Sequence, residues 1–179
     1  MSAPAIKVLC VEDNQLVSDA IGRKLSGRDG FLWLGSAATL DELHGLLGRN
    51  SPDVVCMDFS MPGQDPFEMI KALDERCPDA RVLFLSGHAS HEGISRAISV
   101  GAWGYISKGD DPRTIVESIR RVAAGEFVLG DTAREHYRGA VPMKGQRAPA
   151  PLDSESQPLR VRAMRWLLAR TTRAPKPSE

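Results

Sequence analysis

Short runs of apolar residues alternate along the chain with longer segments in which apolar residues recur every three or four positions. The runs have the length of β-strands and occupy residues 6–11, 31–35, 53–57, 81–85 and 103–106. The segments that follow them have the spacing of amphipathic helices and occupy residues 14–25, 40–47, 65–76, 90–100 and 112–124. The pattern therefore predicts five strand–helix units.

Strands that alternate with helices are expected to pair in parallel, because each helix returns the chain to the edge where the next strand starts. The runs at 6–11, 53–57 and 81–85 are apolar with little interruption, as is typical of parallel strands buried on both faces. We therefore predict one α/β domain over residues 1–125, with a doubly wound, five-stranded parallel sheet and helices on both faces.

The pattern weakens after residue 125. Residues 126–138 predict a short helical extension, with its helix at 131–138. Gly, Pro, Ser and Gln dominate residues 139–158, which predicts a flexible linker. Residues 159–170 read LRVRAMRWLLAR and predict a short basic helix, and residues 171–179 predict a disordered tail.

Charge is balanced over the whole chain, with 23 basic and 23 acidic residues, so the total points to no partner. From Gly139 onward, eight Lys or Arg stand against three Asp or Glu, so a domain of net charge −5 precedes a tail of net charge +5. No apolar run approaches the roughly 18 residues that cross a bilayer. The three cysteines, Cys10, Cys56 and Cys77, are an odd number, which argues against a disulfide framework and for a reducing cytoplasm.

Polar residues stand where the predicted strands end. Glu12 and Asp13 follow the first strand, Asp58 follows the third, Ser86 follows the fourth and Lys108 follows the fifth. In open α/β sheets the ligand site lies outside the carboxyl ends of the strands. We therefore expect these five side chains to converge on one edge of the sheet.

Three carboxylates held together favour a bound cation, and Mg²⁺ suits oxygen ligands and bridges phosphate oxygens. A carboxylate can itself be the nucleophile in phosphoryl transfer, giving an aspartyl phosphate. A lysine and a hydroxyl beside it can then bind the phosphoryl oxygens. Taken singly, each residue also fits a simpler role in a helix cap, a turn or a solvated loop; their joint placement favours the phosphoryl-transfer interpretation.

Four separated motifs resemble those of a known family. They are V-E-D-N at residues 11–14, M-D-F-S-M-P-G at 57–63, L-S-G-H at 85–88 and Y-I-S-K at 105–108. In this order and spacing they resemble the receiver domains of bacterial two-component response regulators, over roughly residues 5–125. The resemblance implies a flavodoxin-like fold with strand order 2-1-3-4-5.

The resemblance implies a role for each residue of the acid cluster. Asp58 would be the phosphoacceptor and would receive its phosphoryl group from a sensor histidine kinase or a phosphotransfer protein. Asp13, Asp58 and the backbone carbonyl of Ser60 would hold Mg²⁺, and Glu12 would reach the metal through water. The chain would catalyse its own phosphorylation and dephosphorylation without being an enzyme for an external substrate.

The remaining motif residues would bind the phosphoryl group and carry the switch. Ser86 and Lys108 would contact the phosphoryl oxygens. On phosphorylation Ser86 would move toward the phosphate, and the ring of Tyr105 would turn inward into the space it leaves. The face made by residues 90–100, 103–106 and 112–124 would then bind a downstream protein partner or form a homodimer.

The sequence departs from the family pattern at two positions, Gly109 and Pro66. Gly109 follows Lys108 where the family often has a proline after a cis peptide, and cis bonds to other residues cost roughly 3 kcal/mol, so the configuration of this bond is left open. Pro66 stands where a glycine is common. His88, two residues after Ser86, lies near the expected phosphate mouth, where it could tune hydrolysis or be a solvated loop residue.

Residues 108–112 (KGDDP) and 119–130 (IRRVAAGEFVLG) resemble the end of receivers that precede a helix-turn-helix output domain. Only about 20 residues follow the predicted linker, and none can supply a recognition helix, so specific DNA binding is not expected. The alternatives are a transcriptional regulator that acts through the basic tail and a phosphorelay intermediate. A phosphatase with an aspartyl nucleophile is disfavoured, because D-F-S lacks the second acid of the D-x-D pattern of such enzymes.

Overall fold

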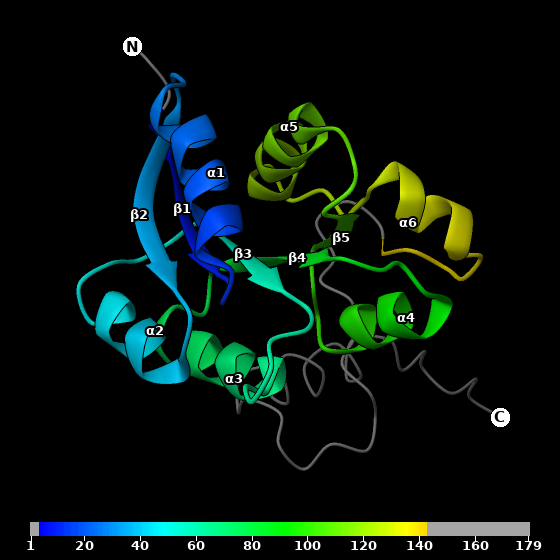
Figure 1. The fold of residues 1–179 in the computed structure, drawn as a ribbon, viewed down its shortest axis with the longest axis horizontal. Coiled ribbons are helices and arrows are strands. Elements are labelled where there is room, and N and C mark those ends of the chain that lie inside the picture. The colour runs from blue at the N-terminus through cyan, green and yellow to red at the C-terminus, as the bar shows by residue number, and fades with distance from the viewer. Residues whose placement is uncertain (1–3, 143–179) are drawn as a thin grey trace, which may run out of the picture.

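The computed structural model describes residues 4–142 as a parallel sheet with helices on both faces (Figure 1). The strands are β1 (Ile6–Val11), β2 (Phe31–Ala37), β3 (Val54–Asp58), β4 (Arg81–Ser86), β5 (Gly104–Ser107) and β6 (Val128–Leu129). The helices are α1 (Gln15–Ser26), α2 (Leu40–Leu47), α3 (Pro66–Arg76), α4 (His91–Ser99), α5 (Pro112–Ala123) and α6 (Asp131–His136).

The strand order is β2-β1-β3-β4-β5-β6, and every pair is parallel. The flavodoxin-like order over the first five strands is as predicted, with elements that agree to within one or two residues. The predicted count of five strands is wrong, because Val128 and Leu129 pair with Gly104 and Tyr105 and add a sixth strand. Two residues are too short a run to show a strand pattern, so the sequence placed them in the helical extension.

Two apolar cores hold the helices on the sheet. One, on the side of α1 and α5, contains Leu25 and Ile119, and the other, on the side of α2, α3 and α4, contains Leu43 and Met69 (Figure 1). Residues along β3 alternate between the two cores, and all five of its residues are buried. This explains its unbroken apolar run, since neither face meets water.

Side-chain caps set where α1, α2, α4 and α5 begin, the last through Asp111. The Asn14 carboxamide accepts the Leu16 N–H at the start of α1. Thr39 and Ser90 likewise accept backbone N–H groups at the starts of α2 and α4. Such caps satisfy donors that have no partner within the helix, so each loop at the carboxyl edge ends at a defined residue.

The extension after α5 packs back onto the sheet. Ala133 of α6 is fully buried in the same core as Tyr105, and α6 lies beside β5 (Figure 1). Within residues 4–142 every helix is too short and too polar to cross a lipid bilayer. The predicted basic helix at 159–170, the disordered tail and most of the predicted linker lie outside the described residues.

Candidate functional site

The carboxylates that the sequence placed at one edge lie together there. Asp58 is the last residue of β3, and Glu12 and Asp13 directly follow β1, which pairs with β3. Parallel strands in register end at the same edge of a sheet. One carboxylate oxygen from each of the three residues lies within 4.8 Å of the others, with Glu12 and Asp58 buried and Asp13 exposed.

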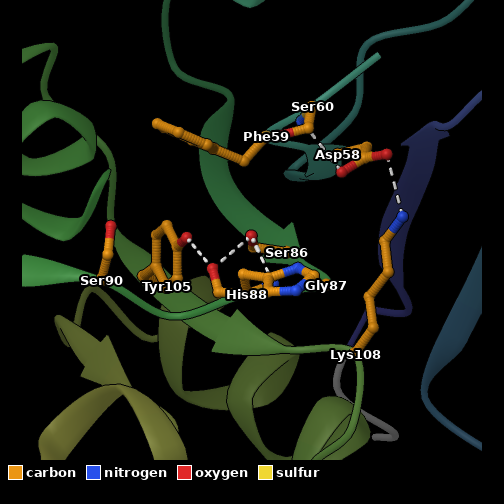
Figure 2. A pocket seen from close by; sticks show the side chains of 9 residues that line it. All are labelled: Asp58, Phe59, Ser60, Ser86, Gly87, His88, Ser90, Tyr105 and Lys108. Atoms are coloured by element: carbon orange, nitrogen blue, oxygen red, sulfur yellow. Dashed lines mark hydrogen bonds and ion pairs between the residues drawn. The ribbon is translucent and has the colours of Figure 1, made fainter. Parts of the chain in front are cut away.

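Lys108 reaches these carboxylates from the loop after β5. Its Nζ lies 2.9 Å from Asp58 Oδ2, the contact drawn in Figure 2, and 2.7 Å from Glu12 Oε2. The Lys108 side chain is 23% exposed, whereas those of Glu12 and Asp58 are 0% and 5% exposed. The ammonium group therefore bridges two carboxylates in a mostly buried setting, where charges interact more strongly than in water.

This setting shifts the protonation equilibria of the bridge. Burial raises the pKa of Glu12, against the opposing effect of its hydrogen bond from Lys108. Burial lowers the pKa of Lys108, but the hydrogen bonds to Glu12 and Asp58 outweigh it, so this pKa is raised overall. Lys108 thus remains a cation at neutral pH.

The donor set at this edge fits a hard divalent cation. Three carboxyl groups stand against the single ammonium of Lys108, and their oxygens are close enough to share an ion. Oxygen ligands with solvent access on one side suit Mg²⁺, which usually keeps several waters. Asp13 is the exposed member, so the open side of the site lies at Asp13.

The hydroxyls of Ser86 and Tyr105 share one acceptor. Ser86 Oγ donates to the His88 carbonyl at 2.7 Å, and Tyr105 Oη donates to the same carbonyl at 2.9 Å (Figure 2). The His88 N–H in turn donates to Ser86 Oγ at 3.2 Å. His88 therefore contributes its backbone to this arrangement, a role that its side-chain chemistry could not predict.

The ring of Tyr105 already lies inward in this structure, with 1% of the residue exposed. The family resemblance implied that the ring would turn inward only on phosphorylation. The physical reason is local: the ring packs edge-on against Phe59, with centroids 5.7 Å apart, and the hydroxyl has a carbonyl partner. Gly93 of α4 leaves room, since a Cβ there would lie 3.4 Å from the Tyr105 hydroxyl.

Phe59 is a site residue that sequence reasoning missed. It directly follows Asp58 and packs edge-on against both Phe84 and Tyr105, with the Phe84 centroid at 5.2 Å. An aromatic residue after a buried strand carries no chemical signal in the sequence. The residue that follows Asp58 in the chain nevertheless packs its ring directly against Tyr105.

An open cavity of about 340 Å³ lies in front of these groups. Figure 2 shows the residues around it, which come from β3, β4 and β5 and from the loops that follow these strands: Asp58, Phe59, Ser60, Ser86, Gly87, His88, Ser90, Tyr105 and Lys108. Residues 4–142 contain no cis peptide bond, so the bond between Lys108 and Gly109 is trans. Pro66 starts α3, where its missing N–H is tolerated.

A flavodoxin-like sheet with an acid cluster and a lysine at its carboxyl edge is the arrangement of a receiver domain. The family model of the response regulator receiver domain matches residues 8–120. The chain therefore belongs to the response regulator receiver family of two-component systems, as its motifs predicted.

Curated relatives agree with this assignment. The chain is 31% identical over 129 residues to the nitrate/nitrite response regulator protein homolog of Haemophilus influenzae, and covers 62% of that protein and 72% of itself. It is 32% identical over 131 residues to the response regulator UvrY of Escherichia coli, and covers 60% of that protein and 73% of itself. The chain thus spans about three fifths of the length of these relatives.

Solved structures show the same fold. A two-component response regulator of the LuxR family from an Aurantimonas species matches with a TM-score of 0.68 and 26% identity, over 74% of this chain and 94% of that one. A response regulator protein from Burkholderia pseudomallei, solved with a phosphorylated aspartic acid and a calcium ion, matches with a TM-score of 0.58 and 26% identity, over 66% and 68% of the two chains.

Proposed function

We propose that this chain accepts a phosphoryl group on Asp58 from the phosphohistidine of a sensor histidine kinase or a phosphotransfer protein. The observation that carries the proposal is the contact between the buried Asp58 carboxylate and Lys108 at 2.9 Å, beside Glu12 and Asp13. The similar Burkholderia pseudomallei protein, which carries a phosphorylated aspartic acid, supports it.

In the proposed transfer, a carboxylate oxygen of Asp58 forms a bond to phosphorus. The bond from phosphorus to the histidine nitrogen breaks, and that nitrogen keeps the electron pair and is then protonated. Lys108, which contacts the Asp58 carboxylate before transfer, then contacts the oxygens of the transferred phosphoryl group. Positioning and charge stabilisation of this kind supply most of the catalysis of phosphoryl transfer. Water later attacks the aspartyl phosphate, so the chain is a transient acceptor and not an enzyme for an external substrate.

The residues present would hold Mg²⁺ through Asp13, Asp58 and the Ser60 carbonyl, with Glu12 linked through water. When bound, the ion supplies positive charge for the phosphoryl oxygens. Glu12 also has a role of its own, because it holds Lys108 in place at 2.7 Å while Asp58 reacts.

The switch would start at Ser86. Its hydroxyl hydrogen can be donated to one acceptor at a time, so a bond to the phosphoryl group requires release of the His88 carbonyl, which Tyr105 retains. The His88 carbonyl, in the β4–α4 loop, thereby loses one of its two hydrogen bonds. We propose that this biases the face made by α4, β5 and α5 toward a cytoplasmic protein partner or a second copy of the chain.

Incubation with acetyl phosphate and Mg²⁺, followed by intact mass, tests the proposal. We expect the wild type to gain one phosphoryl group and Asp58→Asn to gain none. Asp79→Asn is the matched control, because Asp79 is an exposed carboxylate in the loop before β4, at the opposite edge of the sheet. This variant should gain one phosphoryl group. Labelling of Asp58→Asn, or no labelling of the wild type, would refute the proposal.

A further inference from the structure

The turn that carries Lys108 is closed by the carboxylate of Asp110. The Ser107 N–H donates to Asp110 Oδ2 at 3.2 Å, and the Asp110 N–H donates back to the Ser107 carbonyl at 3.1 Å. The Gly109 N–H donates to Ser107 Oγ at 3.2 Å. Lys108 and Gly109 therefore lie inside a small hydrogen-bonded turn, and one side chain, that of Asp110, closes it.

The other oxygen of the same carboxylate is held by α6. Thr132 Oγ1 donates to Asp110 Oδ1 at 2.5 Å, and the Thr132 N–H points to the same oxygen at 3.4 Å. Hydrogen bonds to an ionised carboxylate are shorter and stronger than bonds between neutral groups. Asp110 thus links the Lys108 turn to a helix that lies 22 residues further along the chain.

Gly130 provides the space for this link. A methyl group at Gly130 would overlap the Asp110 carboxylate and would lie 3.2 Å from a side-chain carbon of Ile106. The backbone of Gly130 has φ −64° and ψ 168°, which any residue can adopt, so glycine is needed here for room rather than for conformation. Its N–H also donates to the Tyr105 carbonyl at 2.9 Å, which fixes the start of α6 against β5.

We infer that Asp110 is a positioning residue for Lys108 and that Thr132, in the extension after the receiver helices, holds Asp110 in place. The inference rests on the proposed function, since it assigns Lys108 to the phosphoryl group. Glycine after Lys108 leaves the backbone of the turn free to move. The carboxylate of Asp110 removes that freedom, and α6 thereby becomes part of the phosphorylation site.

A purely structural role of Asp110 makes a different prediction. Gly130, the N-cap residue of α6, has no side chain to accept a backbone N–H, and Asp110 supplies that acceptor from outside the helix. If capping were its whole role, loss of Asp110 would lower the free energy of unfolding and leave the phosphorylation rate unchanged. If it positions Lys108, the rate falls even in protein that remains folded.

The test measures the rate of phosphorylation by acetyl phosphate and, separately, Mg²⁺ affinity by calorimetry in the full chain. We expect Asp110→Ala to slow phosphorylation about tenfold, because small displacements of a charge-stabilising group are costly. Mg²⁺ affinity should not weaken, since the Asp110 carboxylate bonds Ser107 and Thr132 and is not one of the proposed metal ligands. Asp131→Asn removes an exposed carboxylate from the same helix and is the control, with the wild-type rate expected.

Three further variants keep the inference testable if Asp110→Ala folds poorly. Asp110→Asn keeps one side-chain oxygen, which can accept from Thr132 but cannot also replace the oxygen that accepts from Ser107. Its phosphorylation rate should therefore lie between those of the wild type and Asp110→Ala. Gly130→Ala should slow the reaction by displacing the carboxylate. Thr132→Val should slow it as well and add nothing to Asp110→Ala in the double variant.

The outcomes separate this inference from the proposed function. If the wild type is not labelled, the proposed function fails. If the wild type is labelled and folded Asp110→Ala or Asp110→Asn reacts at the wild-type rate, only the positioning role is overturned. Additive slowing by Thr132→Val and Asp110→Ala would overturn the inference that Thr132 of α6 acts by holding Asp110 in place.

Discussion

At the residue scale, Lys108 is the group on which the charge balance of the site depends. Its ammonium is the cation that contacts Glu12 and Asp58, and the Glu12 side chain is fully buried. A buried carboxylate without a partner costs far more than an exposed one. The lysine therefore stabilises the fold, in addition to the role proposed for it at the transferred phosphoryl group.

Lys108→Met should lower the free energy of unfolding in Mg²⁺-free buffer by about 2 kcal/mol at pH 8, less than a fully buried ion pair would lose because Lys108 is partly exposed. The difference in the free energy of unfolding between the wild type and Lys108→Met should become smaller in acid. Burial raises the pKa of Glu12, so this carboxyl group is protonated there and is no longer a buried charge without a partner. Urea unfolding at pH 5 and pH 8 measures both effects.

At alkaline pH the change in stability comes from Lys108 and not from Glu12. The pKa of Lys108 is raised in the folded chain, so its contribution is complete below the ordinary lysine value and is lost as pH rises through the folded pKa. Lys71→Met, which removes an exposed lysine of α3, should change stability little at any pH. An equal loss in both variants would show that Lys108 acts only as general surface charge.

At the element scale, β6 determines which strand lies at the edge of the sheet. It pairs with β5 through Gly104 and Tyr105, so the strand that carries Tyr105 has a neighbour on each side. Gly104 permits the pairing: a Cβ there would lie 2.7 Å from the Val128 carbonyl and 2.7 Å from Leu83 Cδ1. Backbone atoms cannot yield to such a contact as a flexible side chain can.

Gly104→Ala should therefore destabilise the chain by about 2 kcal/mol, because overpacking a close strand pair forces backbone shifts. Hydrogen exchange should rise at Val128 and Gly130, whose N–H groups donate to β5 and the loop before it. Gly45→Ala is the matched control, since that α2 glycine has open space where the Cβ would lie. It should instead stabilise the helix by up to about 1 kcal/mol.

At the scale of the whole molecule, the carboxyl edge concentrates negative charge that the fold must tolerate. Glu12, Asp13 and Asp58 arrive from two neighbouring strands, and the receiver residues together carry an excess of acidic groups. A cation that binds only the folded chain stabilises it by mass action. The proposed binding of Mg²⁺ at this edge would therefore be coupled to folding.

Mg²⁺ should raise the melting temperature of the wild type, with a gain of about 2.7 kcal/mol at a concentration one hundred times its dissociation constant. Asp13→Asn should lose most of this response and should be more stable than the wild type in Mg²⁺-free buffer, because it relieves repulsion among the carboxylates. Scanning calorimetry at constant ionic strength, balanced with a monovalent salt, measures both. An unchanged response in Asp13→Asn would contradict the proposed ligand set.

Much of the fold was predictable because local pattern encodes burial. The apolar run at β3 reflects a strand covered on both faces, and Asn14 and Pro112 mark helix starts by their own chemistry. The site was predictable in composition for a related reason: side chains at the ends of parallel strands must share an edge. Phe59 escaped prediction, since its importance comes from the rings around it.

The sequence by itself determined the receiver family, the order of strands and helices and the identity of the acid cluster, because each can be read from short motifs and from the local pattern of apolar residues. Only the tertiary structure decided the partner of Glu12, 96 positions away at Lys108, the inward position of Tyr105, the sixth strand and the link from Asp110 to Thr132. These features depend on contacts between segments that are far apart in the sequence, and local periodicity does not encode such contacts.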